Sequence, residues 1–135
     1  MKRNISAVVF PVAVCAFFAL SVCFVYLKQV RIEMLNEAGI ITGVILKKQN
    51  MYFTQTGKFL EFGDTPSSSE LGIDLSANVF FTLMKAEVYG DVLTVTITNT
   101  KGFFKGTRSV SKFDNKNGMT HYEVIEKSSI PLPRL

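Results

Sequence analysis

The hydrophobic residues of this chain form one long continuous run, followed by segments in which they alternate with polar residues. The run extends from Ile5 to Leu27 without a charged residue, and the nearest charges are Arg3 and Lys28. A helix of this length is about 35 Å long, which is enough to cross a hydrocarbon core of about 30 Å. Because the run is apolar on every side, it suits lipid or a helix bundle. The pattern predicts a transmembrane or signal-anchor helix in segment 1–27.

The fate of this segment has three alternatives, which the sequence leaves open. It is retained as an anchor, or it is a signal peptide cleaved after the small residues of Ala19-Leu20-Ser21, or it is lipidated at the imperfect lipoprotein box Leu20-Ser21-Val22-Cys23. The apolar run continues to Leu27, beyond the usual signal-peptide core of about 7–15 residues. This length favours a retained, single-pass anchor.

The orientation follows from the basic residues before the run. Lys2 and Arg3 favour a cytoplasmic amino terminus. We therefore expect a protein of the inner (cytoplasmic) membrane whose residues 28–135 form one exported domain, on the periplasmic or extracellular side.

From residue 28 the pattern changes to that of an amphipathic helix, predicted over about 28–56. Apolar residues recur every three or four positions, while Arg31, Glu33 and Lys47 fall mostly on other faces. Thr56-Gly57-Lys58 predicts the helix end, because glycine supplies a left-handed cap. The residues expected to face a sheet are Met34, Ile41, Ile45 and Tyr52, accompanied by Val30 and Ala38.

Three residues are expected to disturb this long helix. Pro11 lacks a backbone donor and clashes with the preceding turn, so it predicts a kink or a helix that begins near it. Gly39 and Gly43 each cost about 1 kcal/mol relative to alanine, which predicts a bend or local unwinding. Their spacing also matches a helix-pairing motif, although it lies outside the apolar run.

The rest of the chain predicts a loop and then a sheet. Gly63, Pro66 and the serines 67–69 indicate a loop over about 57–77. Strand patterns follow at 79–89, 92–98, 106–113 and 119–125, within a sheet region of about 78–126, and a tail covers 127–135. Asp114 to Gly118 predicts a hairpin loop. The fold class is α+β: a long amino-terminal helix whose amphipathic half packs on an antiparallel meander of about four strands.

Composition excludes several kinds of chemistry. Both cysteines, Cys15 and Cys23, fall in the apolar run, so the exported domain has no disulfide, thiol nucleophile or cysteine metal site. The net charge of +4 is too small to imply a polyanionic partner. His121 is the only histidine, and in a strand its neighbours point to the opposite face, so we expect no pairing with Tyr122 or Glu123. No catalytic residue, cofactor or metal site is predicted.

Two weaker alternatives concern the last third of the chain. Asp114, Asn115 and Asn117 offer oxygen ligands for calcium, but the full spacing of a calcium loop is absent, so a hairpin is favoured. Five basic residues and three phenylalanines fit the pattern of a nucleic-acid surface, but a solvated strand face is favoured and no nucleic acid is expected. These residues are Lys101, Lys105, Arg108, Lys112 and Lys116, with Phe103, Phe104 and Phe113.

The order of elements resembles the type IV pilin and type II secretion pseudopilin family. The segment Leu46-Lys47-Lys48-Gln49-Asn50-Met51-Tyr52-Phe53-Thr54-Gln55-Thr56-Gly57-Lys58-Phe59 is similar to the end of a pilin spine helix, and Leu71-Gly72-Ile73-Asp74 is similar to the loop that follows it. The amino terminus departs from the family. It has no glycine-ended leader, and no acidic residue precedes Glu33.

The resemblance implies a non-enzymatic structural or assembly subunit of a pilus-like or secretion-like filament. Its partners are then the membrane and either further copies or other pilin-like subunits. The span residues expected to contact membrane or neighbouring helices are Phe10, Pro11, Phe17, Phe18 and Phe24. The alternative is a membrane-tethered extracytoplasmic binding or sensory domain that uses the helix only as an anchor.

Overall fold

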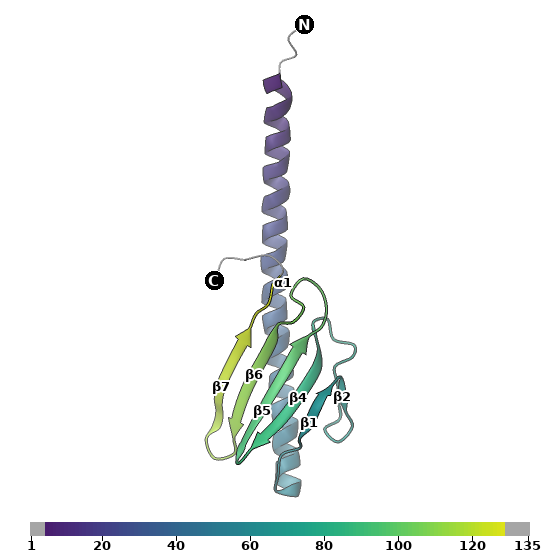
Figure 1. Ribbon diagram of the computed structural model, residues 1–135, viewed down its shortest axis with the longest axis vertical. Coiled ribbons are helices and arrows are strands. Elements are labelled where there is room, and N and C mark those ends of the chain that lie inside the picture. The colour runs from purple at the N-terminus through teal and green to yellow at the C-terminus, as the bar shows by residue number, and fades with distance from the viewer. Residues whose placement is uncertain (1–4, 129–135) are drawn as a thin grey trace. The chain divides into compact units, whose positions relative to one another are not determined.

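The computed structural model describes residues 5–128, with the side chains of residues 5–7 left aside. One helix is followed by seven strands (Figure 1). The elements are α1 (Ile5–Thr56), β1 (Phe62–Thr65), β2 (Ser67–Ser68), β3 (Ile73–Asp74), β4 (Phe81–Tyr89), β5 (Val92–Asn99), β6 (Arg108–Asp114) and β7 (Gly118–Ile125). The chain divides into two compact units, Met1–Glu33 and Met34–Leu135, and α1 contributes to both. The tail predicted at 127–135 lies outside the described residues from position 129 on.

The predicted α+β class is confirmed, with five strands in the main sheet instead of about four. The strand order is β1-β4-β5-β6-β7, and all neighbouring strands are antiparallel. Strands β4 to β7 form the predicted meander (Figure 1). The Asp114–Gly118 turn joins the last two strands as expected.

The segment predicted as a loop, 57–77, contains three short strands, so that prediction was wrong in part. β1 adds to the edge of β4, where Phe62 is level with Ala86 and Thr65 with Met84. β2 and β3 pair with each other as a separate two-stranded sheet. Glycine, proline and serine mark this segment as irregular in sequence, but the hydrogen bonds that make β1 a strand come from β4, which is distant in the chain.

Within the second unit, α1 packs on one face of the five-stranded sheet. Alternate residues of the central strands are buried, as the antiparallel pleat requires: Met84 and Ala86 on β4, and Leu93, Val95 and Ile97 on β5. On the helix, Met34, Ala38, Ile41 and Ile45 are buried as predicted. Tyr52 is only half-buried, so it lies at the margin of this contact. Val30 belongs to the first unit and is half-buried there.

Three further helix residues are buried that the apolar pattern did not select: Thr42, Leu46 and Gln49. Gln49 is fully buried, and both ends of its amide are satisfied by one residue. Its Nε2 donates to the Leu60 carbonyl oxygen at 2.7 Å, and its Oε1 accepts from the Leu60 backbone N–H at 2.9 Å. A polar side chain read as solvent-facing thus fixes the chain just before β1.

Glu37 makes the corresponding link near the start of β4. One carboxylate oxygen, Oε1, accepts from the backbone N–H groups of Phe80 and Phe81 at 3.0 and 2.9 Å. Asn99 at the end of β5 donates to the Phe104 carbonyl oxygen at 3.2 Å and lies 3.6 Å from the Met34 sulfur. Buried polar side chains therefore tie loop backbone to the helix–sheet contact.

Helix α1 is continuous where interruptions were expected. It begins at Ile5 and contains Pro11, so the predicted start near Pro11 was wrong, while a kink there stays a prediction. It also passes through Gly39 and Gly43 without unwinding. Burial of the flanking residues on the sheet outweighs a helix-propensity cost of about 1 kcal/mol per glycine. The predicted stop is confirmed: Gly57 has φ +77° and its N–H donates to the Phe53 carbonyl oxygen at 2.8 Å.

The helix–sheet contact predicts unequal costs along α1. Ile41→Ala or Ile45→Ala should each lower the free energy of unfolding by about 2–5 kcal/mol, because a buried side chain is lost and a cavity remains. The exposed Lys47→Ala should change it by less than about 0.5 kcal/mol. Denaturant unfolding of the full chain in detergent micelles measures all three. Equal, small effects would contradict the packing of α1 on the sheet.

The Gln49 link predicts a cost that hydrophobicity alone does not. Gln49→Ala removes both partners of the Leu60 backbone and should destabilise by about 1–3 kcal/mol. The matched control is Gln55→Ala at an exposed position of the same helix. Hydrogen exchange at the Leu60 amide should rise in the first variant only, and unchanged protection there would show that Gln49 does not hold this segment.

Candidate functional site

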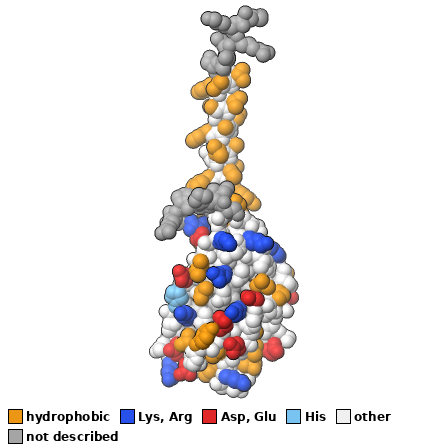
Figure 2. Space-filling model, in the orientation of Figure 1, with side chains coloured by type: hydrophobic (Ala, Val, Ile, Leu, Met, Phe, Trp, Pro, Cys, Tyr) orange, Lys and Arg blue, Asp and Glu red, His pale blue; other side chains and the backbone are white. Residues whose placement is uncertain are grey.

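The apolar part of α1 in the first unit is exposed along its length. From Val8 to Leu27 only Ser21 and Leu27 are half-buried (Figure 2). The predicted span residues are all on this surface, with Phe10 74% and Phe24 48% exposed, and Phe17, Phe18 and Pro11 also exposed. By length and composition the helix is able to cross a membrane, and none of its most apolar window is buried.

The polar atoms of this span fit an apolar environment. The Ser21 hydroxyl donates to the Phe17 carbonyl oxygen at 2.9 Å, so it needs no water. Cys15 and Cys23 are both free thiols on the exposed surface. The aromatic side chains surround the helix rather than forming one stripe, so this segment is suited to lipid or to contact with several helices.

A second exposed apolar surface lies on α1 within the second unit. We call it the outer stripe and define it by Gly39, Ile40, Gly43, Val44 and Met51. Ile40 is 69% exposed, Met51 50% and Val44 45%, while a Cβ atom placed on either glycine would meet nothing within 4 Å. These residues recur at helical spacing on the side away from the buried face, with Lys47 between them. A helix that covers a sheet normally turns charged residues outward, so this stripe is unusual.

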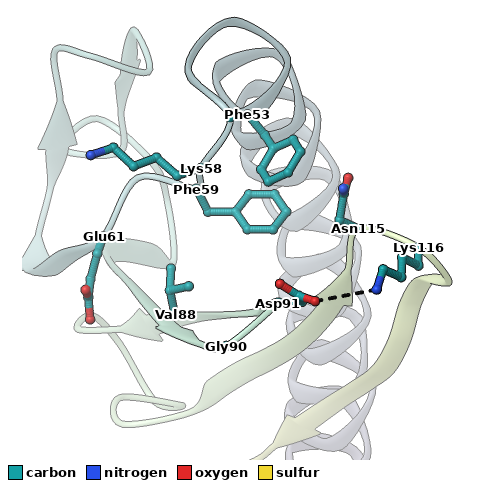
Figure 3. A pocket seen from close by; sticks show the side chains of 10 residues that line it. Phe53, Lys58, Phe59, Glu61, Val88, Gly90, Asp91, Asn115 and Lys116 are labelled. Atoms are coloured by element: carbon teal, nitrogen blue, oxygen red, sulfur yellow. Dashed lines mark ion pairs between the residues drawn. The ribbon is translucent and has the colours of Figure 1, made fainter.

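A cavity of about 400 Å³ lies where α1 ends, between the β4–β5 and β6–β7 turns (Figure 3). We call it the end cavity. The rings of Phe53 and Phe59 lie side by side in it with centroids 4.7 Å apart. Lys58, Glu61, Asp91 and Lys116 add two charges of each sign. The Lys116 Nζ to Asp91 Oδ2 distance is 3.7 Å, and both side chains are more than three-quarters exposed.

A second cavity of about 410 Å³ lies along β1 and β2, and we call it the edge cavity. All four residues of β1 line it, together with Ser67, Ser68, Ser69 and Glu70. The Ser68 and Ser69 hydroxyls donate to Glu70 Oε2 at 3.4 and 3.2 Å. Neither cavity is lined by histidine, so neither brings a serine together with a base that activates it.

The expectation that His121 pairs with neither neighbour was wrong. Its Nε2 lies 3.4 Å from Glu123 Oε2. The two residues are two positions apart, so they share a face of β7, whereas only Tyr122 points to the other side. Both side chains are about half exposed or more, and such a surface pair contributes little stability.

The two weaker alternatives from the sequence concern residues with local tasks. Asp114 Oδ1 accepts from the Lys116 N–H at 2.8 Å and Oδ2 accepts from Asn117 Nδ2 at 2.8 Å, which lowers the pKa of Asp114. This carboxylate therefore fixes the hairpin loop. Across the described residues 5–128, no group of three or more His, Cys, Asp or Glu side chains is placed to hold a metal ion.

The basic and aromatic residues of the last third do not share one surface. Phe104 is buried, and Phe113 makes an edge contact with Phe59 at 5.9 Å between centroids. Lys101 Nζ donates to the Asn78 carbonyl oxygen at 3.0 Å. On the face shown in Figure 2, basic and acidic side chains are interspersed. The stacking rings that single-stranded nucleic acid needs are thus partly used in the core.

Comparison with protein-family models, with curated proteins and with solved structures gave no match for this chain.

Proposed function

We propose that this chain is a non-enzymatic, membrane-anchored assembly subunit of a type IV pilus-like or type II secretion-like filament. The observation that carries the proposal is the outer stripe. α1 buries one face on its own sheet and exposes Ile40, Val44 and Met51 on another, beyond the part needed to cross a membrane. An anchor has no use for an apolar surface there, whereas a subunit packed among other helices does.

The arrangement of α1 supports the same proposal. The span exposes phenylalanines all round, and the outer stripe continues an apolar surface on the same continuous helix. Gly39 and Gly43 leave open space that permits a close approach of another backbone. Since the family's assembly glutamate has no counterpart before Glu33, we expect association with other pilin-like subunits as well as with further copies.

The compartment is part of the proposal. Lys2 and Arg3 place the amino terminus in the cytoplasm, so the second unit lies on the other side of the inner membrane.

A tethered binding or sensory domain is the second candidate, and the end cavity favours it. Its volume of about 400 Å³ falls within the range of small-molecule sites, and it combines two aromatic rings with charges of both signs. In this alternative the outer stripe has no partner and only lipid contacts the span.

The anchor predicts how the full chain fractionates. Carbonate-washed membranes should retain it, because an uncharged apolar helix spans the bilayer. Protease added to spheroplasts should digest the second unit. Mass spectrometry of the mature amino terminus distinguishes the intact chain from one cleaved near Ser21 or lipidated at Cys23. A soluble chain beginning at Val22 would contradict the anchor.

The assembly role predicts that side-chain shape matters on two surfaces of α1. Replacing Phe10, Phe17 and Phe24 by leucine should leave membrane insertion unchanged but weaken self- or partner-association, since lipid accepts any apolar side chain while a packed interface does not. Ile40→Ser combined with Val44→Ser should do the same outside the membrane. Association is measured in the native cell by crosslinking single engineered cysteines in the span, after Cys15→Ser and Cys23→Ser.

The matched control for the outer stripe is Val79→Ser, an exposed apolar residue in the segment before β4. It should leave crosslinking at the unsubstituted level. Crosslinking to neither further copies nor pilin-like partners in the unsubstituted chain would refute the filament proposal and favour the tethered domain.

A further inference from the structure

The main sheet ends in two strands whose outer edges have no partner among the described residues. β1 and β7 stand at the two ends of the order β1-β4-β5-β6-β7. Neither contains lysine or proline, which commonly block pairing at an edge. On β7 the register shift lies opposite Lys112 and Phe113, so His121 to Ile125 form a regular ladder with β6. Both edges thus present free backbone groups for pairing with another strand.

The two edges run in the same direction. Each of the four strand pairings is antiparallel, so the direction reverses four times between β1 and β7 and returns to its starting sense. A second copy placed beside the first in the same orientation therefore sets its β1 parallel to β7. The edge cavity lies along all four residues of β1, so space is open next to this strand.

Rows of paired residues show which side chains would meet. One row crosses the sheet through Tyr122, Ser111, Val95, Ala86 and Phe62. It ends in an aromatic residue at both edges. Tyr122 is 42% exposed and Phe62 is half-buried, so both have contact surface left. Aromatic pairs across neighbouring strands stabilise a sheet.

The neighbouring row on the other face of the sheet has opposite charges at its two ends. It begins with His121 and Lys112 at β7, passes Thr94, and reaches Glu87 on β4. Glu61 directly precedes Phe62 and so lies beside Glu87 at the β1 end. A copy displaced sideways brings the basic end of this row to the acidic end of the next.

We propose that β7 of one copy pairs in parallel with β1 of a second copy of this chain, so that the sheets of neighbouring copies join edge to edge. Tyr122 then lies beside Phe62 of the next copy, and His121 beside its Glu61. The contact is head-to-tail: each copy uses one edge for each neighbour, and the sheet extends along a row of subunits. The inference rests on the proposed anchoring of all copies in one membrane.

That shared anchoring excludes the simplest alternative, a twofold pair of β7 with β7. Such a pair is antiparallel and puts the Met34 ends of the two α1 segments at opposite ends of the dimer. Copies inserted in one membrane enter from the same side. Parallel pairing of β7 with β1 keeps the two copies in one orientation.

The test uses full-length chains in membranes, with Cys15→Ser and Cys23→Ser as background. Two differently tagged copies are co-expressed, one with His121→Cys and the other with Glu61→Cys, both at exposed positions. Neighbouring strands lie about 4.8 Å apart, within the Cα separation of about 4.4–6.8 Å that a disulfide needs. We expect the mixed disulfide at about ten times the yield of His121→Cys with Lys101→Cys, a matched exposed pair away from the edges.

A second pair checks the same register with the charges intact. Tyr122→Cys in one copy and Phe62→Cys in the other should also give the mixed product. Dominant crosslinking of Tyr122→Cys to itself would overturn the proposal in favour of the twofold pair. A yield equal to the Lys101 control for both mixed pairs would overturn it as well.

A companion variant separates this result from the proposed function. Val44→Cys in the same background reports contact at the outer stripe of α1. Crosslinks at Val44 without crosslinks between the edges would overturn the edge pairing and leave the assembly role in place. Absence of both would overturn the edge pairing and the assembly role together.

Discussion

The structure depends on the contact between the second half of α1 and one face of the sheet. An antiparallel meander of this size has one apolar face that must be covered, and α1 is the only helix among residues 5–128. Met34, Ala38, Ile41 and Ile45 cover the buried residues of β4 and β5. Without this contact, neither the amphipathic half of the helix nor the sheet has a partner for its apolar side.

Polar links make this contact specific. Apolar packing alone permits a helix to slide or rotate on a sheet, but Glu37 holds the start of β4 and Gln49 holds the backbone before β1. Each link satisfies backbone groups that lie outside regular pairing, so a shift of the helix would leave buried groups without partners. These two links define which residues of α1 face outward, and the outer stripe is a consequence of them.

The exposed surfaces follow from the same constraint. Because the helix covers the middle of the sheet, β1 and β7 remain open at its edges, and Tyr122 and Met119 stay exposed on the last strand. The end of α1 meets two hairpin turns and forms the end cavity with Phe53 and Phe59. Three kinds of contact surface, on the span, on the outer stripe and at the sheet edges, belong to a chain that presents no catalytic arrangement among its described residues. This combination is what an assembly subunit requires.

The sequence by itself determined the elements whose cause is local. The uncharged run predicts the span, the three-to-four spacing predicts the buried face with Met34, Ile41 and Ile45, and the alternation at 92–98 predicts a strand with one wet face. Gly57 predicts the helix end because only glycine adopts its conformation without strain. These signals depend on residues close together in the chain, and the fold class follows from their order.

Only the tertiary structure decided what depends on distant partners. β1 is a strand because β4 supplies its hydrogen bonds, although its own composition indicates a loop. Gln49 is buried because Leu60 pairs with both ends of its amide, and an isolated polar side chain gives no sign of this. Likewise, Ile40 and Val44 look like core residues in sequence, yet the links at Glu37 and Gln49 turn them outward. The physical reason is common to all three: burial of a polar group or exposure of an apolar one is set by the partner that the folded chain brings to it.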